Sequence, residues 1–183
     1  GMDRPSLNIM AWYGTQGSFV VDYTDDVSIN EFCIKAIHEI LPKYGNPFIG
    51  WERNGVGEAV YQIFKAQGYP DNKIYYQDKG TGKHGVAQSS NLRSIMLVGL
   101  QTGIESKELI IHSQAGINEC FSFVKKLNGP PAAAPGAHDD RVMSMAGANW
   151  CSKQVPSKQN NDFPRSLSRA ESLGTGLVYR GRR

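Results

Sequence analysis

The hydrophobic and polar positions of this 183-residue chain change their period several times, which indicates strands and helices in alternation. Residues 7–13 (LNIMAWY) and 18–23 (SFVVDY) are apolar runs with β-branched and aromatic residues, and a Gly-Thr-Gln-Gly turn joins them. Ser28 and Glu31 then have the spacing of a helix-capping box, and apolar residues follow at helical spacing as far as Lys43. The chain therefore opens with a predicted β-hairpin followed by a helix.

Short apolar runs and helical patterns continue to alternate along the next hundred residues. The predicted strands are residues 48–51, 73–76 and 109–112. The predicted helices are residues 55–68, a helix capped by Ser89 or Ser90 that runs to Leu100, residues 117–124 with Phe121 packed beside them, and a last helix from His138 onward with Val142, Met145 and Ala146 on one face. Strands separated by helices predict an α/β fold in which helices flank a mixed sheet.

The charge of the chain divides it into two parts. Residues 1–150 hold 13 Lys and Arg against 15 Asp and Glu, whereas residues 151–183 hold 7 against 2. The last segment is also rich in Ser, Asn, Gln, Pro, Gly and Arg and has no apolar period, so it cannot bury enough surface to offset its ordering entropy. Setting Gly1 aside as a tag remnant, we predict a domain over residues 2–150 and a flexible basic tail over residues 151–183. The tail either binds the phosphate backbone of a nucleic acid loosely or only increases solubility.

Several classes of protein do not fit this sequence. No apolar run reaches the ~18 residues of a membrane span, and no secretory signal opens the chain. The three cysteines show no zinc-binding spacing and are expected to be reduced thiols, as in a cytoplasm. The stretch 80–83 (GTGK) lacks the spacer and the Ser or Thr of a P-loop, so no ATP site is predicted there.

Two carboxylate sites are candidates for chemistry. Glu52 follows the apolar run FIGW, and an acid at the end of a buried strand lies at the sheet edge where α/β folds bind ligands. Asp139 and Asp140 follow His138 at the start of the last helix. Each site also has a plain structural interpretation. Glu52 can form an ion pair with Arg53, and one of the two aspartates can cap the last helix. Carboxylates gathered from such separate elements can hold two Mg²⁺ ions for phosphodiester hydrolysis.

Three stretches, in order, resemble the C-terminal nuclease domain of bacteriophage terminase large subunits. NPFIGWERNGVGEAVYQIF is similar to an apolar strand ending in an acid before a glycine-rich helix start, and KELIIHSQAGINECFSFV is similar to a later strand followed by a helix that bears an acid. GAHDDRVMSMAGANW resembles the closing His-Asp-Asp signature of the same family. The resemblance covers roughly residues 47–150.

The resemblance implies an RNase H-like fold and two-metal cleavage of concatemeric double-stranded viral DNA. It implies that Glu52, Asp139 and Asp140 are the catalytic residues and hold Mg²⁺ or Mn²⁺, and it makes His138, Lys83 and Arg93 candidates for DNA contact. The implied partners are DNA, a terminase ATPase domain, a small terminase subunit and a portal, in the cytoplasm of an infected bacterial host, with no membrane involved.

One feature of that family has no clear counterpart in this sequence. Its first catalytic aspartate lies on the first strand of the sheet, and this chain opens on what resembles the second or third strand. Either this aspartate is missing or Asp22 replaces it, although Asp22 lies only 30 positions before Glu52, closer than the family pattern implies. The alternative is therefore a truncated, catalytically impaired RNase H-like module that binds DNA or a packaging partner. A relative of Holliday-junction resolvases would share the fold and chemistry, but the closing signature favours the terminase resemblance.

Deletion of the chain beyond Lys153 is expected to leave the melting temperature almost unchanged, because this segment has no apolar period with which to pack on the domain. The same deletion is expected to weaken nonspecific DNA binding and to flatten its salt dependence, since fewer counterions are released. Thermal unfolding and filter binding at several salt concentrations measure both effects. A large fall in melting temperature would show that the tail is structural.

Overall fold

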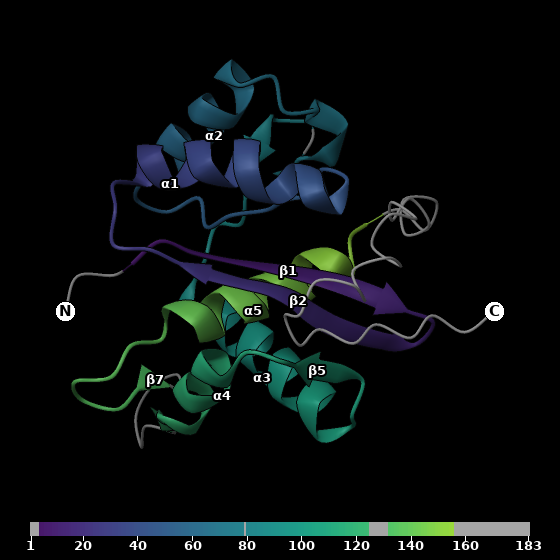
Figure 1. Cartoon of the computed structure of the whole chain (residues 1–183), viewed down its shortest axis with the longest axis vertical. Coiled ribbons are helices and arrows are strands. Elements are labelled where there is room, and N and C mark those ends of the chain that lie inside the picture. The colour runs from purple at the N-terminus through teal and green to yellow at the C-terminus, as the bar shows by residue number, and fades with distance from the viewer. Residues whose placement is uncertain (1–3, 79, 125–131, 156–183) are drawn as a thin grey trace, which may run out of the picture.

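A three-stranded sheet with helices on both faces forms the centre of the molecule (Figure 1). The computed structural model describes residues 4–78, 80–124 and 132–155. Strands β1 (Ser6–Tyr13) and β2 (Gln16–Thr24) form an antiparallel hairpin, and β5 (Leu109–Ile111) pairs with β2 in parallel. The order β1-β2-β5 makes the sheet mixed and leaves β1 at one of its edges.

The remaining elements are helices and two small strand pairs. The helices are α1 (Ile29–Lys35), continued by a π-helical turn (Ala36–Ile40) and a 3-10 turn (Leu41–Tyr44), then α2 (Gly57–Ala66), a 3-10 turn (Asp71–Lys73), α3 (Ser90–Glu105), α4 (Gln114–Phe121) and α5 (Asp140–Ser152). The small pairs are β3 (Tyr76–Asp78) with β4 (Lys83–His84), and β6 (Phe123–Val124) with β7 (Ala132–Ala133).

Local sequence signals account for much of this order. The capping box forms as predicted, with the Ser28 hydroxyl accepting the Glu31 N–H and the Glu31 carboxylate accepting the Ser28 N–H. The Ser89 hydroxyl accepts the N–H of Leu92 and fixes the start of α3. The predicted hairpin is also confirmed, and its turn contains Gly14 with a φ of +65°, a conformation that glycine adopts without steric cost.

Some predicted boundaries were wrong. Residues 48–51 do not form a regular strand, although Ile49 makes a parallel bridge with Ile74 and Glu52 makes one with Val86. The strand expected at residues 73–76 begins only at Tyr76, because a 3-10 turn occupies residues 71–73. The fourth helix begins at Gln114, where the Ser113 hydroxyl caps it, and ends at Phe121. Phe121 is 85% exposed, so the expectation that it packs on this helix was also wrong.

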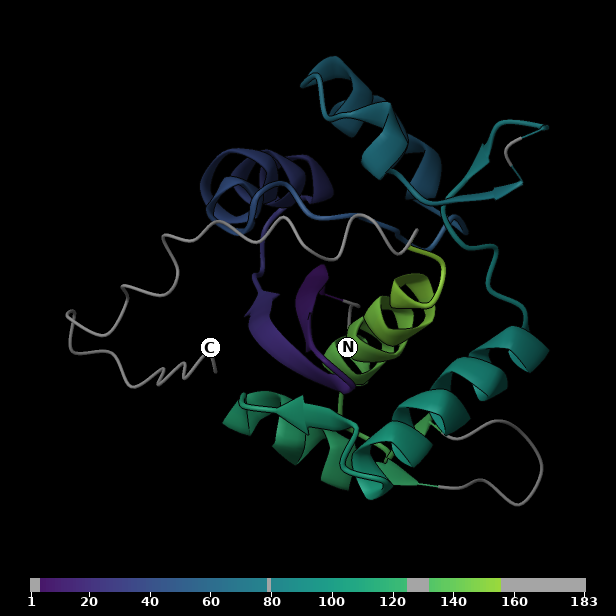
Figure 2. The same cartoon turned by 90° about the vertical axis from the view of Figure 1, so that its right-hand side faces the viewer.

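The core consists of two hydrophobic clusters on opposite sides of the sheet. The α1/α2 cluster comprises Ile9, Cys33, Ile37, Leu41, Val60, Phe64, Tyr69 and Ile74. The α3/α5 cluster comprises Phe19, Tyr75, Val86, Met96, Leu97, Leu100, Leu109, Val142, Met145, Ala146 and Cys151. In Figure 2, α5 (yellow-green) lies along the purple hairpin strands, with α1 and α2 above them. The predicted inward face of α5 is confirmed, because Val142, Met145 and Ala146 are all buried.

Helix α5 continues to Ser152, past the expected domain boundary at residue 150, because Cys151 is buried in the α3/α5 cluster. Most of the predicted tail, residues 156–183, lies outside the described residues, as do residues 125–131. Cys33 and Cys151 are buried and unpaired, as expected for reduced thiols. Within the described ranges, no helix is both long and apolar enough to cross a membrane.

We expect Met145→Ala to lower the free energy of unfolding by about 2–5 kcal/mol, because this fully buried side chain fills space that Ala would leave empty. Phe121→Ala is the matched control, and its effect is expected within about 0.5 kcal/mol because the ring is exposed. Chemical denaturation of both variants measures the difference. Equal effects would contradict the placement of the core.

Candidate active site

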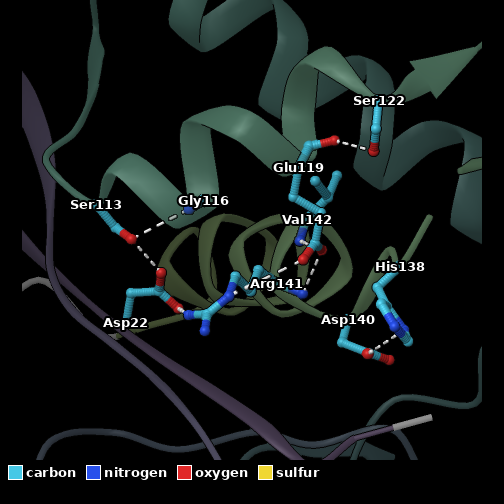
Figure 3. Close-up of polar contacts among 9 residues, drawn as sticks. All are labelled: Asp22, Ser113, Gly116, Glu119, Ser122, His138, Asp140, Arg141 and Val142. Carbon is cyan, nitrogen blue, oxygen red and sulfur yellow. Dashed lines mark hydrogen bonds and ion pairs between the residues drawn. The ribbon is translucent and has the colours of Figure 1, made fainter. Parts of the chain in front are cut away.

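The first turn of α5 is capped by a carboxylate from another helix. Asp139 is the N-cap residue of α5, but its side chain makes no capping hydrogen bond. Instead, Glu119 of α4 accepts the backbone N–H groups of Arg141 at 2.6 Å and of Val142 at 3.0 Å through one carboxylate oxygen (Figure 3). A negative charge is favoured at a helix N-terminus, where backbone N–H groups lack helical partners. Capping by the Asp139 side chain, one plain interpretation of its position, is therefore not what fixes this helix.

A second set of contacts ties α5 to the sheet through Asp22 on β2. One Asp22 carboxylate oxygen pairs with the Arg141 guanidinium, and the other accepts the Ser113 hydroxyl (Figure 3). The Asp22 side chain is only 6% exposed. A buried carboxylate needs such partners, because transfer of an unpaired charge from water is costly. Both Asp22 oxygens are thus engaged, which makes this residue a structural anchor.

Asp140 lies on the other side of the Arg141 side chain, toward His138 (Figure 3). His138 Nδ1 is 3.7 Å from an Asp140 carboxylate oxygen, and the Asp140 side chain is 11% exposed. Burial raises the pKa of Glu119 above its ordinary value, and the negative charge of Asp140 raises it further. Glu119 and Asp140 therefore form a pair of mutually repelling acids at the start of α5, a feature common at functional sites.

Asp139 has a different partner. Its carboxylate pairs with the guanidinium of Arg93, which projects from α3, and both side chains are partly buried. Arg93 was predicted to contact DNA, and in the structure its guanidinium forms an ion pair with the Asp139 carboxylate. Lys83 is exposed on β4 and His138 is 44% exposed, so both are accessible to a ligand.

Glu52 joins the aspartates along a single cavity. The cavity has a volume of about 1140 Å³, and Glu52, Asp139, Asp140 and Arg93 all contribute to its wall. Glu52 is exposed and lies at an isolated bridge, where a buried strand end was expected. The structure therefore places the three predicted catalytic residues on one cavity, and their joint catalytic role stays a prediction.

The described residues do not complete a metal centre. Among them, no three His, Cys, Asp or Glu side chains gather closely enough to hold an ion. Glu119 caps α5, and Asp22 is bound by Arg141 and Ser113. Mg²⁺ requires near-octahedral oxygen ligands, which these positions alone do not supply.

Sequence reasoning missed the contacts that organise this site. It noted an acid on the helix INECF but did not assign Glu119 a role, and it overlooked Ser113 and Arg141. The signal available for Glu119 was an acid among apolar residues of a helix expected to pack on the domain. Nothing in the sequence spacing could show that Arg141 reaches Asp22, because the two residues are 119 positions apart.

Comparison with solved structures relates this fold to that of a viral nuclease. The structure is similar to a crystal structure of the large terminase nuclease from thermophilic phage G20c with bound magnesium, with a TM-score of 0.55. The two chains are 16% identical, and the match covers 82% of each. No protein-family model and no curated protein matches the sequence. The expected resemblance is thus confirmed at the level of the fold, which is a mixed α/β terminase nuclease-like fold.

The free energy of unfolding is expected to carry a pH dependence from Glu119. Because its folded-state pKa is raised above the ordinary value of 4.5, its contribution to stability is complete below about pH 4.5 and is lost as pH rises through the folded-state value. Glu119→Gln retains an oxygen for the two N–H groups but does not titrate. Relative to this variant, the wild-type chain is therefore expected to lose stability as pH rises above 4.5.

Urea denaturation between pH 4 and pH 8 measures this difference. Glu39→Gln, at an exposed position, serves as the control for removing a carboxylate. Parallel stability curves for the wild-type and Glu119→Gln chains would contradict the burial of Glu119 against α5.

Proposed function

We propose that this chain is a nuclease domain of a viral DNA-packaging terminase, which acts on phosphodiester bonds of concatemeric double-stranded DNA with Mg²⁺ or Mn²⁺. The observation that carries the proposal is the placement of Glu52, Asp139 and Asp140 on one cavity within a terminase nuclease-like fold. Magnesium is bound in the structural relative, and acidic side chains on a cavity wall are the residues expected to bind a hard cation.

A second candidate function is supported by the same site. Within residues 4–78, 80–124 and 132–155 no metal-binding group of three side chains forms, and both oxygens of Asp22 are engaged. A two-metal reaction uses both ions, one at the attacking and one at the leaving oxygen, and this set of residues does not supply the ligands for them. The second candidate is therefore a module that binds DNA or a packaging partner and cleaves weakly by itself.

The nuclease and a DNA-binding form of the second candidate both predict contact with DNA. Lys83 and His138 are exposed, and the basic segment 151–183 adds a net positive charge that favours the phosphate backbone. By resemblance to terminases, the further partners would be an ATPase domain, a small terminase subunit and a portal, in an infected bacterial cell. The two candidates differ in catalysis, so nicking measured together with binding separates them.

We expect the 183-residue chain to nick supercoiled plasmid only weakly in millimolar Mn²⁺, because its described residues do not complete a metal centre. The same chain is expected to bind duplex DNA, with an affinity that falls roughly ten- to fortyfold between 50 and 200 mM salt if two or three phosphates are contacted. Plasmid-nicking and gel-shift assays on the wild-type, Glu52→Ala, Asp140→Asn and Asp22→Ala chains measure both properties.

The nicking activities of the variants distinguish the candidate functions. Robust nicking that is lost in both Glu52→Ala and Asp140→Asn would establish the enzyme and reject the impaired module. Robust nicking lost in Asp22→Ala, with folding verified by circular dichroism, would place Asp22 in the catalytic site and contradict its purely structural role. Absence of both nicking and DNA binding would reject the nuclease and the DNA-binding form of the second candidate.

A further inference from the structure

Arg93 of α3 and Asp139 at the start of α5 form an ion pair that the local stability of neither helix explains. Asp139 occupies the N-cap position of α5, but Glu119 accepts the backbone N–H groups that an N-cap carboxylate would ordinarily accept. Arg93 lies near the N-terminus of α3, the end of a helix at which the macrodipole disfavours a positive charge. The reason for the two side chains therefore lies in what they do together.

The ion pair lies where a ligand can reach it. The Arg93 and Asp139 side chains are 22% and 29% exposed, and both contribute to the wall of the cavity that Glu52 and Asp140 also line. An ion pair with this much exposure contributes little to stability, because water screens the attraction and solvates both charges when they separate. The pair can therefore open at a small cost in free energy.

The Asp139 carboxylate shows which class of group the Arg93 guanidinium accepts. A guanidinium presents N–H donors in one plane, and these donors match two oxygens that share a negative charge. The carboxylate of an aspartate and the two non-bridging oxygens of a phosphodiester both have this form. A terminal nitrogen of Arg93 donates to an Asp139 oxygen, as it would to a phosphate oxygen. Asp139 and a phosphate group therefore compete for the same positive charge.

The competition favours a polyanion over a small anion. Asp139 belongs to the same chain as Arg93, so its effective concentration at the guanidinium is high and a free phosphate ion displaces it poorly. Duplex DNA carries one negative charge per ~1.7 Å of its axis, and contacts elsewhere on the protein hold further phosphates close to Arg93. A DNA backbone can therefore open an ion pair that a free phosphate ion leaves closed.

We propose that Arg93 is a phosphate-binding residue and that Asp139 is its internal competitor, which a DNA backbone displaces and a free phosphate ion does not. The proposal rests on the proposed function for the choice of DNA as the source of the phosphate. Displacement also releases the Asp139 carboxylate on the cavity wall that it shares with Glu52 and Asp140. Binding of the backbone and release of this acid are then coupled, so each favours the other.

A double-mutant cycle on the full chain tests the exchange, with a short fluorescent duplex as the probe and EDTA present so that no cleavage occurs. Asp139→Asn is expected to bind the duplex about tenfold more tightly than the wild-type chain, because Arg93 then binds phosphate without leaving a charged partner. In the Arg93→Gln background the same substitution is expected to change the affinity less than about twofold. Glu39→Gln, at an exposed position on the π-helical turn, measures the effect of losing one negative charge elsewhere.

Two further measurements distinguish exchange from a purely structural ion pair. The slope of log affinity against log salt concentration is expected to be shallower by about 0.9 in Arg93→Gln than in the wild-type chain, because one phosphate contact is lost. Inorganic phosphate is expected to raise the melting temperature of Asp139→Asn more than that of the wild-type chain or of the double variant. Without ligand, Asp139→Asn is expected to melt below the wild-type chain, so its stability and its DNA affinity change in opposite directions.

Equal duplex affinities for the wild-type and Asp139→Asn chains, or equal salt slopes for the wild-type and Arg93→Gln chains, would overturn the proposal. If a variant does not fold, the Nε–H resonance of Arg93 in the wild-type chain decides the matter, since it should shift when duplex is added and stay in place when inorganic phosphate is added.

The outcomes also separate this proposal from the proposed function. Duplex binding that neither substitution changes would overturn the role of the Arg93–Asp139 pair and leave the proposed function intact. Binding of inorganic phosphate by Asp139→Asn, with no duplex binding by any of the chains, would overturn the displacement by DNA and count against the proposed function as well.

Discussion

The attachment of the first turn of α5 to both α4 and β2 is the constraint on which the site depends. Glu119 accepts two N–H groups at the start of α5, and Arg141 reaches back to a nearly buried Asp22. The first contact sets where the helix begins, and the second sets its position against the sheet. Removal of one partner from a buried pair leaves the other charge uncompensated, so the two contacts are coupled to the folding of the domain. They also fix the start of the helix that carries Asp140, which lines the cavity.

This arrangement explains why the acids of the site have unequal roles. Both Asp22 oxygens and one Glu119 oxygen are engaged by protein donors, and Asp139 is paired with Arg93, so these carboxylates hold elements together. Asp140 and Glu52 line the cavity. A nuclease centre for two cations needs several oxygen ligands within reach of one another, and the described residues do not bring them together. The proposed nuclease and the alternative of a catalytically impaired module both follow from how few of the oxygen ligands come together.

The core is divided into two clusters by the central sheet. Small domains usually form one contiguous hydrophobic core, whereas here the α1/α2 and α3/α5 clusters lie on opposite sides of an incomplete sheet. The hairpin supplies two strands and β5 a third, but β1 and residues 48–52 do not meet. The side-chain amide of Asn8 lies on the cavity wall between them and has no hydrogen-bond partner within the part of the chain that the structure describes.

The sequence by itself determined the alternation of elements, the opening hairpin, the capping box at Ser28, the cap at Ser89 and the buried face of α5, because these depend on periodicity and on contacts between residues close in the chain. Motif order also indicated the terminase nuclease-like fold and the acids at positions 52, 139 and 140. Only the tertiary structure decided that residues 48–51 stay outside the main sheet, that Glu119 rather than Asp139 caps α5, and that Asp22 binds Arg141 across 119 positions. These contacts join elements that are far apart in the chain, and no periodic pattern links such elements. The packing of the elements determines which contacts form, and no local pattern encodes that packing.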